Sequence, residues 1–138
     1  MDARQVRTDP DPLEPYCISQ AFRVGELVIT SGQAAIDRHG NLVGVGDFAA
    51  QAEQVFANLA EVLEAAGSGL AQVIKVTIYL TDMGRFPDIV ALRERYFTPP
   101  YPADTIVEVK ALALPELEIE IEATALATGS TLAAGAPQ

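Results

Sequence analysis

Carboxylates are the side chains best suited to chemistry in this sequence, and three of them recur near its C-terminal end. Glu118, Glu120 and Glu122 alternate with apolar residues, so a β-strand would carry all three on one face. Like charges at this spacing repel one another, which argues against three equally solvated groups. A positioned carboxylate can hold a water molecule and transfer protons. The simpler interpretation is a solvated strand face with no chemical role.

Cys17 and His39 are the other candidates for a nucleophile and a base. Each is the only residue of its type, and His39 lies in the polar loop Asp37–Asn41, far along the chain from Cys17. A catalytic thiol needs an electropositive setting and a base. A zinc-type metal site needs a cluster of His and Cys ligands. We therefore expect neither thiol catalysis nor a metal site, and no cofactor.

Composition excludes several classes of protein. The formal net charge is −10, from 19 acidic and 9 basic residues, and such a field repels a nucleic-acid backbone. A single cysteine rules out a disulfide framework within the chain and favours a reducing, cytoplasmic compartment. The N-terminus does not resemble a signal peptide, and no run approaches the roughly 20 apolar residues that cross a bilayer. We expect one domain over residues 1–127 and a flexible tail over residues 128–138.

Hydrophobic periodicity predicts the elements that must position these side chains. Residues 1–15 are expected to form an arm or a weak edge strand. Helices are predicted over Asp47–Ala66 and from Thr81–Asp82 to Pro99–Pro100, and strands in two pieces over Phe22–Thr30 and over Val73–Leu80, Thr105–Val109 and Glu118–Ala125. This order favours an α+β sheet with both helices on one face. Another copy of the chain is then expected to cover the other face.

Five segments, in order and at matching spacing, resemble the Rid (YjgF-type) family. They are Ser19–Gln33, Asn58–Gly67, Val73–Met83, Tyr101–Val109 and Ile119–Ala123. The resemblance implies a chorismate-mutase-like fold with a mixed sheet, assembled as a homotrimeric barrel with small-molecule clefts between subunits. Well-known members of this family hydrolyse enamines and imines to carbonyl compounds and ammonia.

The resemblance also points to a substitution at the substrate-binding position. Active members place an arginine after Pro-Ala to grip the substrate carboxylate, and Asp104 stands there in this chain, flanked by Ala103 and Thr105. Exchanging a bidentate guanidinium for a carboxylate reverses the charge offered to the ligand. Either the ligand is neutral, cationic or larger, or another arginine compensates; the candidates are Arg23, Arg38, Arg85, Arg93 and Arg95. If Asp104 and Glu120 line one cleft, one of them should have a raised pKa and could serve as a catalytic proton carrier. The alternative is that Asp104 only opens a strand.

Four further residues are assigned to the cleft by the same resemblance. Glu120 matches the glutamate that orients water, and Gly32 matches a position where backbone approaches the ligand. Ile18 stands where active members carry a tyrosine, and Tyr16 lies two residues earlier. A bulge could bring Tyr16 to the cleft; otherwise Tyr16 is an interface aromatic, and Gly32 a simple strand-end glycine.

Three functions therefore remain open. The first is a deaminase acting on reactive imines other than small 2-imino acids. The second is a non-catalytic trimer that binds a small molecule or regulates. The third, an endoribonuclease, fits poorly with the net charge of −10 and the lone histidine.

Overall fold

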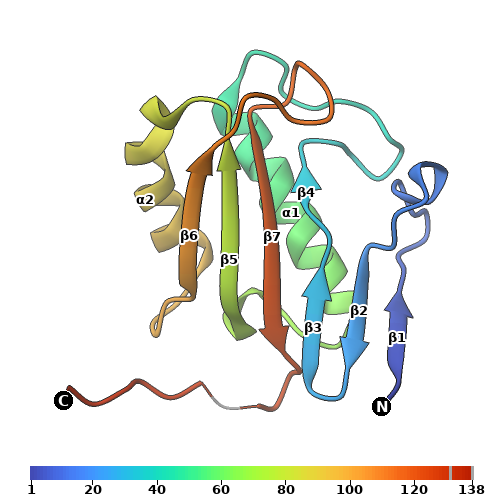
Figure 1. Cartoon of the computed structure of the whole chain (residues 1–138), viewed down its shortest axis with the longest axis vertical. Coiled ribbons are helices and arrows are strands. Elements are labelled where there is room, and N and C mark those ends of the chain that lie inside the picture. The colour runs from blue at the N-terminus through green and yellow to red at the C-terminus, as the bar shows by residue number, and fades with distance from the viewer. Residues whose placement is uncertain (131, 138) are drawn as a thin grey trace.

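Alternating apolar and polar residues build one mixed β-sheet, which two helices cover on one face (Figure 1). The structure is a computed structural model that describes residues 1–130 and 132–137. The strands are β1 (Ala3–Val6), β2 (Ala21–Val24), β3 (Leu27–Thr30), β4 (Gln33–Ala34), β5 (Val73–Leu80), β6 (Ala103–Glu108) and β7 (Ile119–Leu126). They follow the order β1-β2-β3-β7-β5-β6, with β4 also paired to β7. Only the β5–β6 pair among these is parallel, which makes the sheet mixed as expected.

Helix α1 (Phe48–Ala65) forms where the apolar stripe predicts it. The Asp47 side chain accepts a hydrogen bond from the Ala50 amide and so caps the first turn. Gly67 follows the helix with φ of +78°, a conformation that a side chain disfavours. The stripe is buried against the sheet, and Phe56 at its centre is 1 % exposed.

Helix α2 (Phe86–Tyr96) begins later than the sequence predicts. A short 3₁₀ helix over Met83–Arg85 precedes it, and Asp82 caps that turn by accepting from the Gly84 amide. The prediction of a helix from Thr81–Asp82 was therefore wrong at its first turn. Its apolar stripe is also only partly buried, because Ile89 is covered whereas Val90 is 42 % exposed.

The core lies between the helices and one face of the sheet. Along β7 the apolar residues are buried and the polar ones half-buried, and β5 pairs with it so that Ile78 lies beside Ile121. The two helices meet through Phe56 and Tyr96, whose rings stack 4.2 Å apart. Both helices lie behind the sheet in Figure 1, as predicted.

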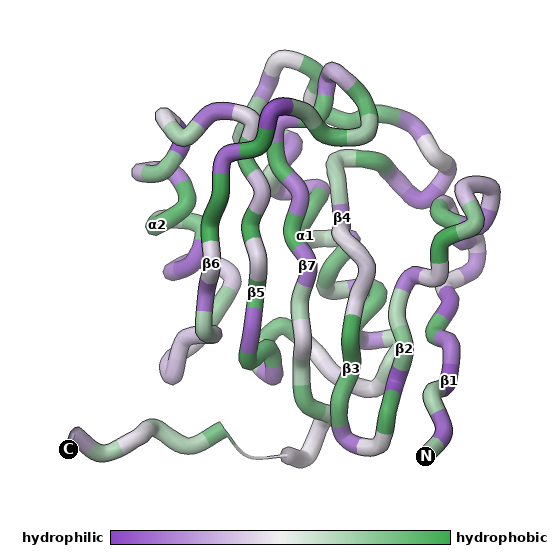
Figure 2. The backbone as a smooth tube through the Cα atoms, viewed as in Figure 1, coloured by the Kyte–Doolittle hydropathy of each residue, from purple (hydrophilic) through white to green (hydrophobic). Residues whose placement is uncertain are grey.

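The face away from the helices carries exposed apolar side chains. Phe22, Leu27 and Ile29 are 39–50 % exposed there, and Val107 on the far strand is 36 % exposed. The tube of Figure 2 is coloured hydrophobic along most of β3, which contributes two of them. A sheet face of this kind is typical of a surface that another chain covers.

The N-terminal arm pairs as an edge strand, since β1 runs antiparallel to β2. Strand β4 was not predicted; it is a two-residue pairing with β7 beyond the end of β3. The proposed tail over residues 128–138 includes positions 131 and 138, which lie outside the described residues, so its flexibility stays a prediction. Neither helix of the described chain combines the length and apolar content that crossing a membrane requires.

Candidate functional site

A cavity of about 320 Å³ lies between β4, the start of β7 and the loop that joins β1 to β2. This loop, residues 7–20, is called the N-terminal loop below. Four of the predicted site residues line it together: Tyr16, Ile18, Gly32 and Glu120. The rest of the lining is mostly apolar, and consists of Pro12, Leu13, Gln33, Ala34, Ile36, Asn58, Ala113, Leu114 and Leu117. A larger groove of about 620 Å³ lies between the start of α1 and α2; of the residues singled out from the sequence, it is lined only by the candidate arginines Arg85 and Arg95.

Gly32 leaves room for the Glu120 side chain, which any larger residue at this position would displace. A Cβ atom placed on Gly32 would lie 2.5 Å from Glu120 Oε2 and 2.7 Å from its carboxyl carbon. The carboxylate therefore rests directly over the backbone that links β3 to β4. This close approach gives Gly32 a role beyond that of a strand-end glycine.

The three glutamates of the acidic face differ in their partners. Glu118 contacts Gln51 through its backbone and side chain, and Arg85 lies 3.9 Å from it. Glu122 accepts a hydrogen bond of 2.6 Å from the Tyr79 hydroxyl. The Glu120 side chain forms no hydrogen bond or ion pair with any residue in 1–130 or 132–137, although its backbone pairs within the sheet. Of the three, Glu120 is the one free to act on a bound molecule.

Two features of its surroundings raise the pKa of the Glu120 carboxyl. Burial raises the pKa of this carboxyl above its ordinary value of 4.5, and the negative charge of Glu122 raises the pKa further. A carboxyl whose pKa moves toward neutrality exchanges protons more readily near physiological pH. The site thus holds one group suited to general acid–base chemistry.

The N-terminal wall of the cavity depends on a sharp turn at Cys17. A 3₁₀ helix over Glu14–Tyr16 ends at Cys17, whose φ is +61°, in the left-handed region. This turn sends the chain back so that Tyr16 and Ile18 both line the cavity, while Cys17 is exposed and does not. A left-handed turn, rather than a bulge, places Tyr16 along the cavity wall, and its role as a ligand contact stays a prediction.

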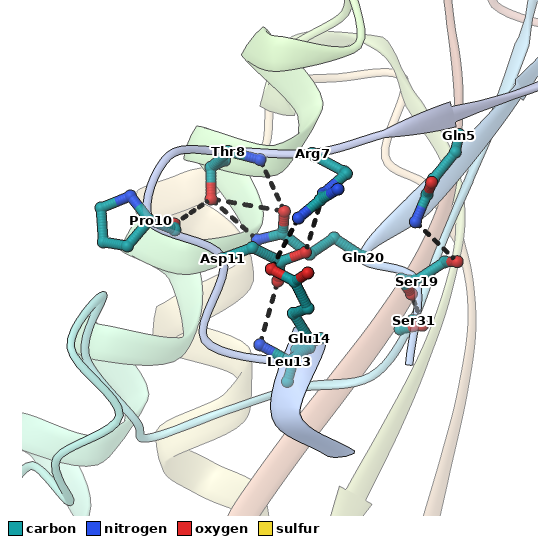
Figure 3. Close-up of polar contacts among 10 residues, drawn as sticks. All are labelled: Gln5, Arg7, Thr8, Pro10, Asp11, Leu13, Glu14, Ser19, Gln20 and Ser31. Atoms are coloured by element: carbon teal, nitrogen blue, oxygen red, sulfur yellow. Dashed lines mark hydrogen bonds and ion pairs between the residues drawn. The ribbon is translucent and has the colours of Figure 1, made fainter. Parts of the chain in front are cut away.

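Polar contacts fix this wall to the sheet (Figure 3). Gln20 is buried, and its side-chain oxygen accepts from the Thr8 amide at 2.6 Å. The Ser31 hydroxyl donates to the Ser19 carbonyl, which ties the loop to the end of β3. A buried side chain bonded on both of its polar atoms is costly to disturb, and Gln20 also donates to the Thr8 hydroxyl.

Ion pairs within the same loop also stabilise it. Arg7 lies 2.6 Å from Glu14 and 3.5 Å from Asp11. Asp11, with a side chain only 2 % exposed, also accepts from the Leu13 amide at 3.0 Å. These bonds hold Leu13 against the cavity and leave Arg7 engaged with two carboxylates.

Helix α1 holds the opposite wall. The Asn58 side chain donates to the Ala34 carbonyl at 2.9 Å and to the Ile36 carbonyl at 2.7 Å. Gln33 donates to the Ser31 carbonyl at 3.1 Å. Asn58 therefore commits both of its amide hydrogens to backbone carbonyls, and Gln33 commits one of its two.

Asp104 lies elsewhere in the chain. Its register places it beside Val76 on the helix-covered face, whereas Glu120 lies beside Tyr79 on the other face. Two strand spacings of about 4.8 Å and three residues of about 3.3 Å put their Cα atoms roughly 14 Å apart. Within one chain, the two carboxylates therefore do not share a cleft.

The Asp104 carboxylate is bound by Arg93, one of the arginines that could have compensated for it. Nε and Nη2 of Arg93 each lie 2.9 Å from an Asp104 oxygen, and the two side chains are 25 % and 18 % exposed. This bidentate pair joins α2 to β6. Ala103 and Thr105 point to the open face, where Thr105 accepts a hydrogen bond from Lys75.

Sequence reasoning missed the loop between β6 and β7. Leu114 and Leu117 come from it and line the cavity, as does Leu13 from the N-terminal loop. Several leucines and alanines over residues 111–117, in a segment too short for another element, were the available signal. His39 lies exposed in its turn, away from Cys17, and residues 1–130 and 132–137 hold no cluster of three metal-ligating side chains.

Comparison of the sequence with known proteins identifies a family and several relatives. The model of the family described as Endoribonuclease L-PSP matches residues 6–127. A RutC family protein of Pyrococcus horikoshii is 42% identical over 116 residues, covering 84% of this chain and 90% of that protein. A 2-iminobutanoate/2-iminopropanoate deaminase of Dermatophagoides farinae is 35% identical over 113 residues, covering 82% and 86%.

Solved structures agree with the sequence relatives. A putative endoribonuclease of Thermotoga maritima superposes with a TM-score of 0.83 at 40% identity, covering 94% of this chain and all (100%) of that one. RidA of a Psychrobacter species gives a TM-score of 0.81 at 36% identity, covering 89% and 98%. The sheet with two helices on one face is thus the YjgF-type fold, and the chain belongs to the Rid/YjgF family, whose family model bears the name Endoribonuclease L-PSP.

Proposed function

We propose that this protein hydrolyses reactive imines or enamines to carbonyl compounds and ammonia. The observation that carries the proposal is the Glu120 carboxylate, which is half-buried over Gly32 in an apolar cavity and has no partner among the described residues. A deaminase of this kind among the relatives supports the reaction class.

The reaction asks little of the protein beyond binding and proton transfer. Water adds through its oxygen to the C=N carbon, the nitrogen gains a proton, and a tetrahedral carbinolamine forms. Its C–N bond then breaks, ammonia leaves, and the hydroxyl proton is released as the carbonyl forms; no oxidant or reductant is needed. Glu120 accepts the proton of the attacking water and returns a proton to the departing nitrogen. Tyr16 and Ile18 line one part of the cavity wall.

We infer that the working unit is a homotrimer. The apolar side chains Phe22, Ile29 and Val107 on the open sheet face support association with further copies of the chain. In such an assembly a neighbouring β6 could bring Ala103, Asp104 and Thr105 to the cavity, which one chain cannot do. Sedimentation or light scattering tests the assembly, and a stable monomer would contradict it. We also propose a cytoplasmic location, because a chain with a single cysteine suits a reducing compartment.

Glu120→Gln provides the direct test of the chemistry. The variant keeps the size and shape of the side chain but cannot carry the proton, so imine hydrolysis is expected to fall by about a hundredfold. Glu64→Gln on the exposed side of α1 makes the same charge change away from the cavity and should leave hydrolysis unchanged. Unaltered activity in Glu120→Gln would refute the assigned role.

A trimer that binds a small molecule without turning it over is the second candidate. Asp104 favours it, because a carboxylate bound to Arg93 stands where active relatives grip their substrate. Saturable ligand binding with no hydrolysis of any imine would support this candidate. Ribonuclease activity is the least favoured; RNA cleavage that survives extensive purification and is lost in Glu120→Ala would establish it.

A further inference from the structure

The cavity around Glu120 offers a ligand no positive charge. Its lining holds one carboxylate and, within residues 1–130 and 132–137, no lysine, arginine or histidine. Both amide hydrogens of Asn58 and one of the two of Gln33 are bonded to backbone carbonyls. A substrate carboxylate placed here would find only neutral side-chain donors, the Tyr16 hydroxyl and the second Gln33 amide hydrogen, and would face Glu120.

The guanidinium groups closest to the cavity walls are already engaged. Arg7, at the base of the N-terminal loop, contacts Asp11 and Glu14. Arg38, beside Asn58 in a small neighbouring recess, lies 3.6 Å from Glu61. Releasing either arginine to bind an anion would break an existing ion pair.

A second chain would not supply a free guanidinium through β6. If a neighbour brings its Asp104 segment to the cavity, it brings a carboxylate bound to Arg93, a pair with no net charge. Lys75, on the same stretch of the sheet, keeps its positive charge while it donates to the neutral Thr105 hydroxyl. This segment would therefore bring one ammonium, held by Thr105, and no guanidinium free for a bidentate contact.

The walls instead suit an apolar body. Leu13, Ile18, Leu114 and Leu117 line the cavity with apolar side chains, and a volume of about 320 Å³ is at the lower end for small-molecule sites. A C=NH nitrogen becomes cationic on protonation and so is attracted to the Glu120 carboxylate. That contact would place the electrophilic carbon next to the group that activates water.

From this arrangement we propose that the cavity selects imines that have an apolar body and no carboxylate, in neutral or N-protonated form, over 2-imino acids. The proposal rests on the proposed imine hydrolysis and specifies its substrate class. Loss of a charge-assisted contact lowers affinity roughly ten- to a hundredfold. We therefore expect a preference of at least tenfold in kcat/KM.

A matched pair of substrates isolates the carboxylate. A flavin monoamine oxidase acting on 2-phenylethylamine releases 2-phenylethanimine, and a flavin amino-acid oxidase acting on phenylalanine releases 2-imino-3-phenylpropanoate. The two imines differ only in the carboxylate, and semicarbazide traps each before hydrolysis. The full-length protein should suppress semicarbazone formation at least ten times more efficiently for the carboxylate-free imine. Equal or reversed efficiency overturns the substrate class while leaving imine hydrolysis intact.

Binding separates the two proposals if neither imine is hydrolysed. Calorimetry with 2-phenylethylamine and with phenylpyruvate, two stable analogues, then decides the ligand class. At least tenfold tighter binding of the amine supports the selectivity although the hydrolase assignment has failed. Equal binding, or preference for the acid, overturns it.

A charge placed on the rim should reverse the preference. Leu114→Arg introduces a guanidinium at an exposed lining position and is expected to shift the kcat/KM ratio at least tenfold toward the 2-imino acid. Leu114→Gln alters polarity without adding charge and should shift the ratio less. Equal shifts in the two variants would contradict the electrostatic argument.

Discussion

Substituting Gly32 by alanine should inactivate the protein without unfolding it. The added Cβ would lie 2.5 Å from Glu120 Oε2, while ordinary contacts begin at 3.4 Å, so the carboxylate must move by about 1 Å. The backbone at Gly32 is outside the positive-φ region that disfavours side chains, so alanine fits the chain itself. A displacement of about 1 Å of a catalytic group costs on the order of a hundredfold in rate.

Stability should change little in the same variant. Replacing a glycine in a compatible conformation reduces the entropy of the unfolded chain and stabilises by about 0.4–1 kcal/mol. Moving a side chain that has no hydrogen-bond partner offsets part of this gain, so the free energy of unfolding should stay within about 1 kcal/mol of the parent. Urea denaturation measures this quantity beside the imine assay.

Gly69→Ala is the matched control. A Cβ at Gly69 meets nothing within 4 Å, and the backbone there is extended with φ of −178°. This variant should keep full activity. The reasoning is refuted if Gly32→Ala retains activity within twofold, or if a crystal structure of that variant shows Glu120 unmoved.

Three further predictions concern charged groups. Arg93→Ala and Asp104→Ala should show a coupling of about 1 kcal/mol in a double-mutant cycle of unfolding free energies, because the pair is bidentate and mostly buried; strict additivity would contradict this. Asp104→Arg should gain hydrolysis of 2-iminobutanoate, and no gain in a folded trimer would argue that position 104 lies outside the site. The raised pKa of Glu120 means that the folded state binds this proton more tightly than the unfolded chain, so the unfolding free energy should fall as pH rises from 4.5 through the raised pKa. Glu120→Gln should remove that part of the fall, and an unchanged pH slope would count against it.

Periodic segments could be predicted because their pattern is local. The apolar stripe of α1 follows from residues three or four positions apart. The alternation along β5 and β7 follows from residues two positions apart. The start of α2 could not, since Asp82 caps a 3₁₀ turn in the same way as it would cap an α-helix. Strand β4 is too short to carry a pattern of its own and exists through its pairing with β7.

The site was predictable only in part for the same reason. The resemblance identified Tyr16, Ile18, Gly32 and Glu120, which meet in one cavity. The partner of Asp104 depends on how α2 lies across β6, and several arginines were equally eligible from sequence. The contribution of the loop over residues 111–117 depends on where the β6–β7 connection folds back.

The contrast among the three glutamates illustrates the limit most clearly. Glu118, Glu120 and Glu122 are equivalent in the sequence pattern, which only predicts that they share a strand face. Gln51 and Tyr79, from distant parts of the chain, engage the outer two. The middle one is left over Gly32, and this difference arises from tertiary packing.

A crystal of the protein soaked with 2-phenylethylamine tests the central claim most directly. The account predicts difference density inside the cavity, with the amine nitrogen within hydrogen-bond distance of Glu120 and the phenyl ring against Leu13 and Leu117. A clear ligand bound elsewhere, such as beside Asp104 and Arg93, with the space over Gly32 empty, would contradict it.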